Sequence, residues 1–134
     1  MKIIGISGHK GSGKDTAMLC LAREYADTDV IRFSAGLKFV MRMCFGLEDQ
    51  DSQNAKDAVM ANGKTVRENQ QYVGTDVMRA IDPECWANWW KRAVNNAMQP
   101  DACPPYLVVS PDVRYPNEVK AIHDLGGHVI RLTR

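Results

Sequence analysis

The chain has 134 residues, of which 45% are hydrophobic and 25% are charged, so it can form one hydrophobic core and is expected to be a single domain over residues 1 to 134. The formal net charge of +1 argues against a surface that coats polymeric nucleic acid, so a bound anion would be held by a local site. We expect no targeting segment, and no apolar run is long enough to cross a membrane, which favours a cytoplasmic protein that does not bind membranes.

The first half of the chain alternates apolar runs with helical patterns. Residues 2–8, KIIGISG, predict a strand that ends in glycines, and a helix follows the glycine loop. Residues 29–34 predict a second strand, and residues 36–47 a helix closed by Gly46. The apolar positions of the two helices are Met18, Leu21, Ala22 and Tyr25 in the first and Leu37, Val40, Met41, Cys44 and Phe45 in the second. The polar stretch 47–64 predicts only a short helix over 55–61 and a turn at ANGK.

The second half begins with a mixed segment, residues 65–81, for which we expect a helix, a break at Gly74 and a second helix. Residues 82–98 predict a helix with Asp82 as N-cap and Pro83 at its first position. The buried stripe of that helix would contain Trp86, Trp89, Trp90, Ala93, Val94 and Ala97. A linker over 99–105, a strand over 106–110, a helix over 115–127 with a glycine stop and a strand over 128–134 complete the pattern.

The four cysteines are scattered without the spacing of a metal site, and Cys20 and Cys44 fall on expected apolar helix faces. The others are Cys85 and Cys103. We interpret all four as reduced thiols.

Continuously apolar strands separated by helices predict a parallel sheet covered on both faces, so the expected fold class is α/β. Ligands of such sheets bind at the carboxyl ends of the strands. Three polar segments follow expected strands: the glycine loop, SAGLK, and SPDVRYPNE. Residues 35–105 are too many for one crossover helix, and we expect them to form a helical lobe over the edge of the sheet.

The glycine loop, GHKGSGKDT, is close to the phosphate-binding pattern G-x-x-x-x-G-K-[ST]. Its glycines allow backbone N–H groups to turn toward an anion, Lys14 would add a charge on the β- and γ-phosphates, and Thr16 a hydroxyl. The loop residues expected to bind phosphate are Lys10, Gly11, Ser12, Gly13, Lys14, Asp15 and Thr16. The alternatives are that the glycines merely form a tight turn and that Lys10 is a solvated loop lysine.

Asp15 occupies the position where the pattern has Ser or Thr. A carboxylate in the first turn of a helix is favoured by the helix dipole, but beside phosphates it needs a cation. We therefore expect Asp15 to face a magnesium site together with Asp112; the alternative is that Asp15 only begins the helix.

The segment SPDVR places Asp112 after an apolar strand, where a carboxylate could hold Mg²⁺, and Arg114 two residues later, where it could bridge phosphates. In the alternative, Asp112 caps the next helix and Arg114 pairs with Glu118. Arg67 and Arg79 lie on either side of GTD and could reach one ligand, although each alone is more often a surface arginine. The tryptophans are interpreted as core or subunit interface, with base stacking as the minority alternative.

Five stretches in order make the chain resemble the deoxynucleoside monophosphate (dNMP) kinases of bacteriophages and their bacterial relatives, members of the P-loop superfamily. They are GHKGSGKDT, FSAGLK, TVRENQQYVGTDVMRAIDPECW, VVSPDVRYPNEV and GGHVIRLTR. The resemblance implies a three-layer P-loop kinase fold with a helical lobe for the nucleoside monophosphate. It also implies transfer of the γ-phosphoryl group of ATP to a dNMP with Mg²⁺, in the cytoplasm, or in the host cytoplasm for a phage protein.

The resemblance also implies roles for individual residues. Gly11, Gly13, Lys14, Asp15 and Thr16 would serve ATP; Lys38, Arg67, Gly74, Thr75, Arg79 and Trp86 would line the monophosphate site; Asp112, Arg114 and Glu118 would lie between the nucleotides. Lys14, Arg79, Asp112 and Arg114 are the expected catalytic residues, and Asp15 and Asp112 the expected metal ligands.

The chain departs from the family in two places. Relatives often carry a basic residue where this chain has Gly11, and they continue past the last strand with a lid-like segment, a further strand and a helix. We expect the exposed sheet edge to favour a homodimer. The competing interpretations are a kinase of dephospho-coenzyme A or another small metabolite, and a nucleotide-binding protein without turnover.

Overall fold

The computed structural model describes residues 1–99 and 103–133, and part of the expected linker lies outside these residues. The chain forms two compact units. The first, called here the sheet unit, contains Met1–Phe33 and Ala87–Arg134; the second, the helical unit, contains Ser34–Trp86. Within the described ranges, no helix combines the length and the apolar character needed to span a bilayer.

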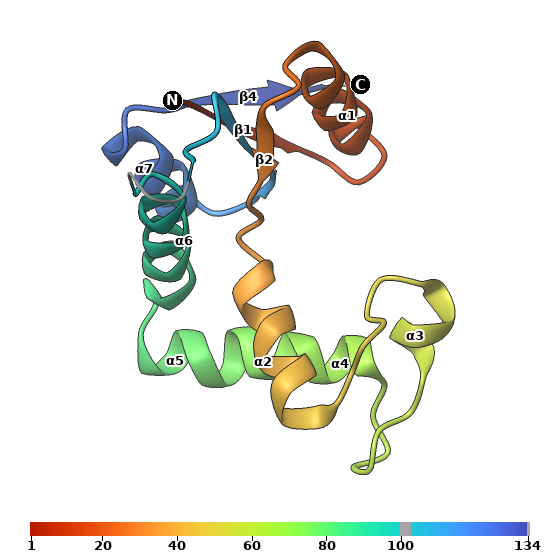
Figure 1. Ribbon diagram of the computed structural model, residues 1–134. Helices are drawn as coiled ribbons and strands as arrows, with labels where there is room; N and C mark the ends of the chain where they lie inside the picture. Colours follow the sequence, from red (N-terminus) through yellow and green to blue (C-terminus); the bar gives the residue numbers. More distant parts are fainter. Residues whose placement is uncertain (100–102, 134) are drawn as a thin grey trace. The chain divides into compact units, whose positions relative to one another are not determined.

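The sheet unit contains four parallel strands (Figure 1). They are β1 (Lys2–Gly8), β2 (Thr28–Val30), β3 (Leu107–Val113) and β4 (His128–Leu132). Their order is β2-β3-β1-β4, so β1 and β3 form the centre of the sheet. The expected α/β class with a parallel sheet is confirmed.

Helices cover both faces of this sheet, which gives three layers (Figure 1). On one face α1 (Lys14–Glu24) contributes Met18 and Leu21, which pack against Ile6 and the apolar side chains of β3. On the other face lie α6 (Cys85–Ala97) and α7 (Pro116–Asp124), whose buried side chains form the larger core cluster. The sheet is therefore apolar on both sides, as its continuous hydrophobic strands predict.

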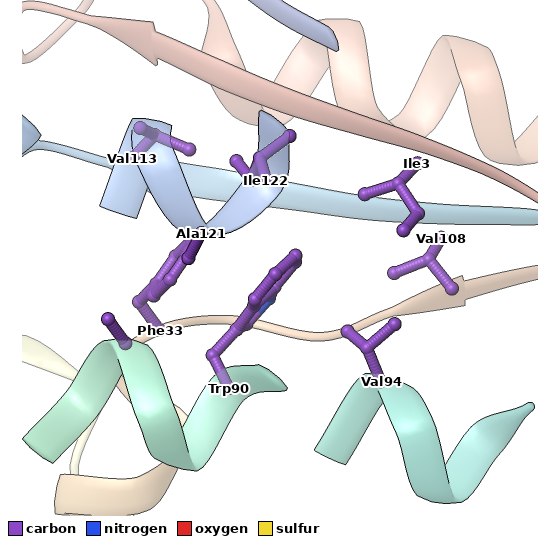
Figure 2. Close-up of a cluster of buried hydrophobic side chains, with 9 residues drawn as sticks. Ile3, Phe33, Trp90, Val94, Val108, Val113, Ala121 and Ile122 are labelled. Carbon is purple, nitrogen blue, oxygen red and sulfur yellow. The ribbon is translucent and has the colours of Figure 1, made fainter. Parts of the chain in front are cut away.

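Trp90 lies at the centre of the larger cluster (Figure 2). Its side chain is 0% exposed and stacks on Phe33, with ring centroids 4.7 Å apart. Trp90 Nε1 donates hydrogen bonds to Ser110 Oγ at 2.8 Å and to the Ile31 carbonyl at 3.1 Å. Ser110 Oγ also donates to that carbonyl, at 2.6 Å. The interpretation of the tryptophan stripe as core is thus confirmed for Trp90.

A register shift marks the carboxyl end of β3. Gly5 of β1 pairs with Ser110, whereas Ser7 pairs with Val113, so β3 carries one extra residue. Pro111 lies in this irregular stretch, and proline, which has no N–H to donate, is tolerated inside a sheet at such bulges. The strand therefore extends beyond the predicted limit at residue 110, and Asp112 belongs to its last residues.

The helical unit consists of short helices from one continuous stretch of chain. They are α2 (Ala35–Phe45), α3 (Gln53–Asp57), α4 (Val66–Gln71), the π-helix η1 (Tyr72–Met78) and α5 (Arg79–Ile81). Gly46 ends α2 at φ +68°, as expected. Thr65 and Glu68 form a capping box that begins α4, which connects directly to η1 and α5.

The expected break at Gly74 is wrong, because the helix continues through this residue as a π-helix. Gly74 is buried, and a Cβ atom there would lie 2.9 Å from Leu37 Cδ2. Its carbonyl accepts a hydrogen bond from Trp86 Nε1 at 3.0 Å. The glycine thus permits close packing of two helices instead of interrupting one. Trp86, only 6% exposed, is also a core residue.

Other predicted limits differ from the structure for local reasons. The helix expected over 55–61 is α3, which begins earlier because Ser52 Oγ caps it by accepting the Ala55 N–H at 3.1 Å. Asp82 Oδ1 accepts the Glu84 N–H at 2.9 Å, and α6 then begins at Cys85, two residues after the predicted Pro83. The regular part of β2 ends before residue 31.

Some positions assigned to apolar helix faces are exposed. Cys20, Cys44 and Phe45 lie at the surface, and only Met41 is buried among the five predicted apolar positions of α2. An apolar pattern on a short helix does not specify how much of that face other elements cover.

The compact helical unit ends at Trp86, whereas the expected lobe extended to residue 105, because α6 from Ala87 onward packs on the sheet.

Replacing Trp90 by Phe should remove the Nε1 donor while retaining an aromatic ring beside Phe33. We expect the free energy of unfolding to fall by about 1–3 kcal/mol, because buried acceptors on Ser110 and Ile31 lose a donor. Urea denaturation measures this change. Trp89→Phe is the matched control, since the indole of the half-buried Trp89 makes no hydrogen bond to the described residues; equal losses in both variants would contradict the role given to Nε1.

Asp124 connects α6 and α7 electrostatically. Hydrogen bonds from Lys91 and Lys120 lower the pKa of its carboxyl to about 2 from an ordinary 3.8. A pKa lowered by folding stabilises the protein above the unfolded value, and that stabilisation is lost as the pH falls from about 4 to about 2. In D124N, the decrease in the free energy of unfolding between pH 6 and pH 2 should therefore be smaller than in the wild type.

Denaturant titrations of both proteins across this pH range measure the difference. High salt is the control, because it screens the ion pairs of Asp124 with the half-buried Lys91 and the exposed Lys120, and should bring the wild-type profile closer to that of D124N. Parallel profiles at low salt would show that the ion pairs do not stabilise the native state.

Candidate phosphate-binding site

The glycine loop connects β1 to α1 in the sheet unit. Gly11 and Gly13 have φ of +80° and +90°, a left-handed conformation that glycine adopts without the strain of a side chain. Gly13 is the N-cap of α1 and provides no side-chain hydrogen bond, so no capping side chain satisfies the first N–H groups of the helix. Such a helix start, behind a glycine-rich turn, favours an anion.

Lys14 extends back across the loop that precedes it. Its Nζ donates to the carbonyl oxygens of Gly8 at 2.7 Å and His9 at 2.9 Å. These two contacts hold the ammonium group at the loop, next to the start of α1. The lysine of the sequence motif is therefore held by its own loop.

The start of the loop is tightly packed. A Cβ atom at Gly8, whose φ is +151°, would lie 2.8 Å from the carbonyl oxygen of Leu132 in β4. The same Cβ would contact Ser12 Oγ, a buried atom that has no hydrogen-bond partner among the described residues. Only glycine fits here, and the neighbouring strand helps to define the loop.

Asp15 follows Lys14 and contacts an arginine that the motif does not contain. Its Oδ1 lies 3.4 Å from Nη2 of Arg32, which comes just after β2. The Asp15 side chain is 77% exposed and that of Arg32 35% exposed. Thr16 and Lys10 are exposed as well. Charge of both signs therefore lies at the start of α1.

Asp112 is held beside the chain that leaves β2. Its Oδ1 accepts a hydrogen bond from the Phe33 N–H at 2.9 Å. The Ile31 N–H donates to the Val109 carbonyl at 3.0 Å, so the pairing of β2 with β3 continues past the regular strand. Asp112 is half-buried, which leaves its carboxylate accessible from the carboxyl edge of the sheet.

The buried carboxylate of Glu118 accepts hydrogen bonds at the start of α7. The side chain is 3% exposed, and Oε2 accepts the backbone N–H groups of Arg114 at 2.6 Å and Tyr115 at 3.0 Å. The carboxylate that caps this helix is therefore that of Glu118, and the residue at the N-cap position is Tyr115. Glu118 fixes the backbone of Arg114, whose side chain is exposed.

The residues predicted for the monophosphate lie in the helical unit. Lys38 Nζ forms an ion pair with Asp51 at 2.6 Å. Arg67 and Thr75 are exposed, whereas Arg79, at the start of α5, is half-buried. Gly74 and Trp86 are joined by the hydrogen bond described above. Trp86 thus contacts the backbone next to Thr75, and its indole ring is packed inside the unit.

Two further groups of the helical unit have shifted pKa values. Hydrogen bonds from the Ser52 hydroxyl and from nearby backbone N–H groups lower the pKa of Asp49. Burial raises the pKa of the Cys85 thiol. Neither residue belongs to the predicted sites.

The sheet unit contains carboxylates that could serve as ligands of Mg²⁺. No group of three or more His, Cys, Asp or Glu side chains suited to a metal occurs within residues 1–99 and 103–133. Mg²⁺ in nucleotide sites is bound by one or two carboxylates, with water and phosphate oxygens as the other ligands. Asp112 and Asp15 each have carboxylate oxygens, the ligand type that a magnesium ion takes when it arrives with a nucleotide.

Sequence patterns missed two parts of this site. Arg32 was not singled out, although a charged residue directly after the apolar pattern of β2 was the available signal. The hydrogen bonds of Trp90 and Ser110 to Ile31 were also missed, because they join residues far apart in the chain. The structure places the loop residues, Asp112, Arg114 and Glu118 in one unit and the predicted monophosphate residues in the other.

The whole length of the chain is similar to a known viral protein. No protein-family model matches it. A protein of Acanthamoeba polyphaga mimivirus with the name "Putative deoxynucleotide monophosphate kinase" is 33% identical over 151 residues, covering 100% of this chain and 75% of the viral protein. The alignment includes both the glycine loop and the helical unit. The chain therefore belongs to the deoxynucleotide monophosphate kinase family.

Proposed function

We propose that this protein transfers the γ-phosphoryl group of ATP to the 5′-phosphate of a deoxynucleoside monophosphate, giving ADP and the deoxynucleoside diphosphate. The observation that carries the proposal is the position of the Lys14 ammonium group, held on the carbonyls of Gly8 and His9 next to the start of α1. In the proposal, this loop forms a cradle for phosphate groups. Membership in the kinase family supports phosphoryl transfer as the reaction.

ATP would be bound by the glycine loop. In the proposal, Lys14 contacts the β- and γ-phosphates, the N–H groups of the loop and of the first turn of α1 bind phosphate oxygens, and Thr16 adds its hydroxyl. The loop residues in this role are Lys10, Gly11, Ser12, Gly13, Lys14, Asp15 and Thr16. Their backbone donors are fixed by the fold, which reduces the reorganisation needed when charge shifts during transfer.

Magnesium would be bound near Asp112 and Asp15. A bound Mg²⁺ would supply positive charge that offsets the negative charge of the phosphates. Asp112 suits this role because its hydrogen bond to the Phe33 N–H fixes the orientation of the carboxylate. Arg114, whose backbone is fixed by Glu118, would add a planar cation for phosphate oxygens.

The deoxynucleoside monophosphate would be bound by the helical unit. The residues proposed for it are Lys38, Arg67, Gly74, Thr75, Arg79 and Trp86, of which the buried Gly74 and Trp86 would act by positioning Thr75, with Glu118 acting through Arg114. An acceptor phosphate oxygen is already a nucleophile, so the reaction needs no general base. Rate enhancement would come from aligning the two nucleotides and neutralising their charge.

A coupled assay of ADP release with ATP and Mg²⁺ tests the proposal. The acceptors to compare are dGMP, dTMP, dCMP, hydroxymethyl-dCMP, dAMP and dephospho-coenzyme A. We expect ADP formation to depend on at least one dNMP. Activity with dephospho-coenzyme A alone would identify a different kinase, and ATP binding without ADP formation would identify a binding protein.

In the same assay, Lys14→Met should lower kcat by about 10²–10³, the typical cost of removing one positioned charge donor. Lys64→Met is the matched control, because Lys64 is exposed in a turn of the helical unit. Similar rates for the two variants would show that Lys14 does not act on the transferred phosphate.

A further inference from the structure

Arg32 lies between Ile31 and Phe33, two residues whose backbone groups are held by hydrogen bonds. Before it, the Ile31 carbonyl accepts hydrogen bonds from Ser110 Oγ at 2.6 Å and Trp90 Nε1 at 3.1 Å. After it, the Phe33 N–H donates to Asp112 Oδ1 at 2.9 Å, and the Phe33 ring stacks on Trp90. The backbone position of Arg32 at the carboxyl edge of the sheet is therefore fixed by the hydrogen bonds of both neighbouring residues.

The side chain of Arg32 is directed from this point to the glycine loop. Its Nη2 lies 3.4 Å from Oδ1 of Asp15, in the first turn of α1. Both side chains are partly exposed, and exposed ion pairs of this length contribute little to stability. Stabilisation of the fold therefore does not account for an arginine held in this place.

The charges at the loop supply a second argument. Asp15 adds a negative charge beside Lys14, at the helix start where phosphate groups would bind. A carboxylate there repels phosphate unless a cation lies between them. Arg32 is the cation that contacts this carboxylate, and a guanidinium group has five donors, enough to bind a carboxylate and a phosphate oxygen together.

We propose that Arg32 is a further phosphate-contacting residue of this site, and that Asp15 orients its guanidinium group toward the terminal phosphate of a nucleoside triphosphate. The inference rests on the proposed function only in taking ATP as the ligand. It gives Asp15 a second task besides the magnesium environment: Oδ1 contacts Arg32, and Oδ2 makes no hydrogen bond to the described residues.

The test is isothermal titration calorimetry with ATP, ADP and inorganic tripolyphosphate, with and without Mg²⁺. Arg32→Gln should weaken binding of ATP and tripolyphosphate about tenfold or more, the usual effect of losing a hydrogen bond to a charged group. ADP, which lacks the terminal phosphate, should lose less. Arg32→Lys should retain part of the affinity, because it keeps the charge without the planar fork.

Arg23→Gln is the matched control. Arg23 is exposed in the last turn of α1, at the end of this helix away from the glycine loop. Its replacement by Gln changes the net charge by the same amount as Arg32→Gln. If Arg23→Gln and Arg32→Gln weaken tripolyphosphate binding equally, or if neither does, Arg32 is not a phosphate contact. Circular dichroism of each variant establishes that it is folded.

Asp15→Asn combined with Arg32→Gln completes a double-mutant cycle. If Asp15 orients Arg32, the two replacements together should weaken ATP binding by less than the product of their single effects. If the double variant weakens ATP binding by the product of the two single effects, Asp15 does not orient Arg32. If the wild type is an active kinase but Arg32→Gln does not change tripolyphosphate binding, this inference alone is wrong. If the wild type binds ATP but forms no ADP, the proposed function alone is wrong.

Discussion

The carbonyl oxygen of Ile31 receives two hydrogen bonds, from the hydroxyl of Ser110 and the indole of Trp90, and the carboxyl edge of the sheet depends on them. A half-buried carbonyl that loses its donors would be costly, so the backbone after β2 is held against β3. This places the Phe33 N–H beside Asp112. The orientation of a predicted metal ligand is therefore set from the core, by residues that contact no phosphate in the proposed function.

Glycines at two places allow neighbouring elements to approach closely. Gly8 lies where a side chain would collide with the carbonyl of Leu132, so the glycine loop is packed directly on the neighbouring strand β4. Gly74 permits the approach of Leu37, and its carbonyl accepts the indole N–H of Trp86. In both units, residues that the motifs associate with binding are also required for packing, which links the site to the stability of the fold.

Most of the fold follows from patterns that are local in sequence. The apolar strands predicted a parallel sheet, and the loop of Lys14 was predicted from its spacing. The π-helix at Gly74 was not, because a glycine in a helical pattern indicates a break unless the close neighbour, Leu37, is known. Arg32 was missed for the same reason: its contact to Asp15 depends on which strand ends lie together. Long-range contacts of this kind leave no periodic signal.

The strand order β2-β3-β1-β4 has a consequence for biosynthesis. The two strands made first are not neighbours, because β3 lies between them and ends only at Val113. At roughly 5–20 residues per second, a ribosome needs about 4–17 s after finishing β2 to complete β3. During that interval β1 and β2 have no sheet partner, and the contiguous helical unit is synthesised before β3 begins. The nascent chain thus carries unpaired strand edges for seconds, the period in which chaperones and aggregation compete for it.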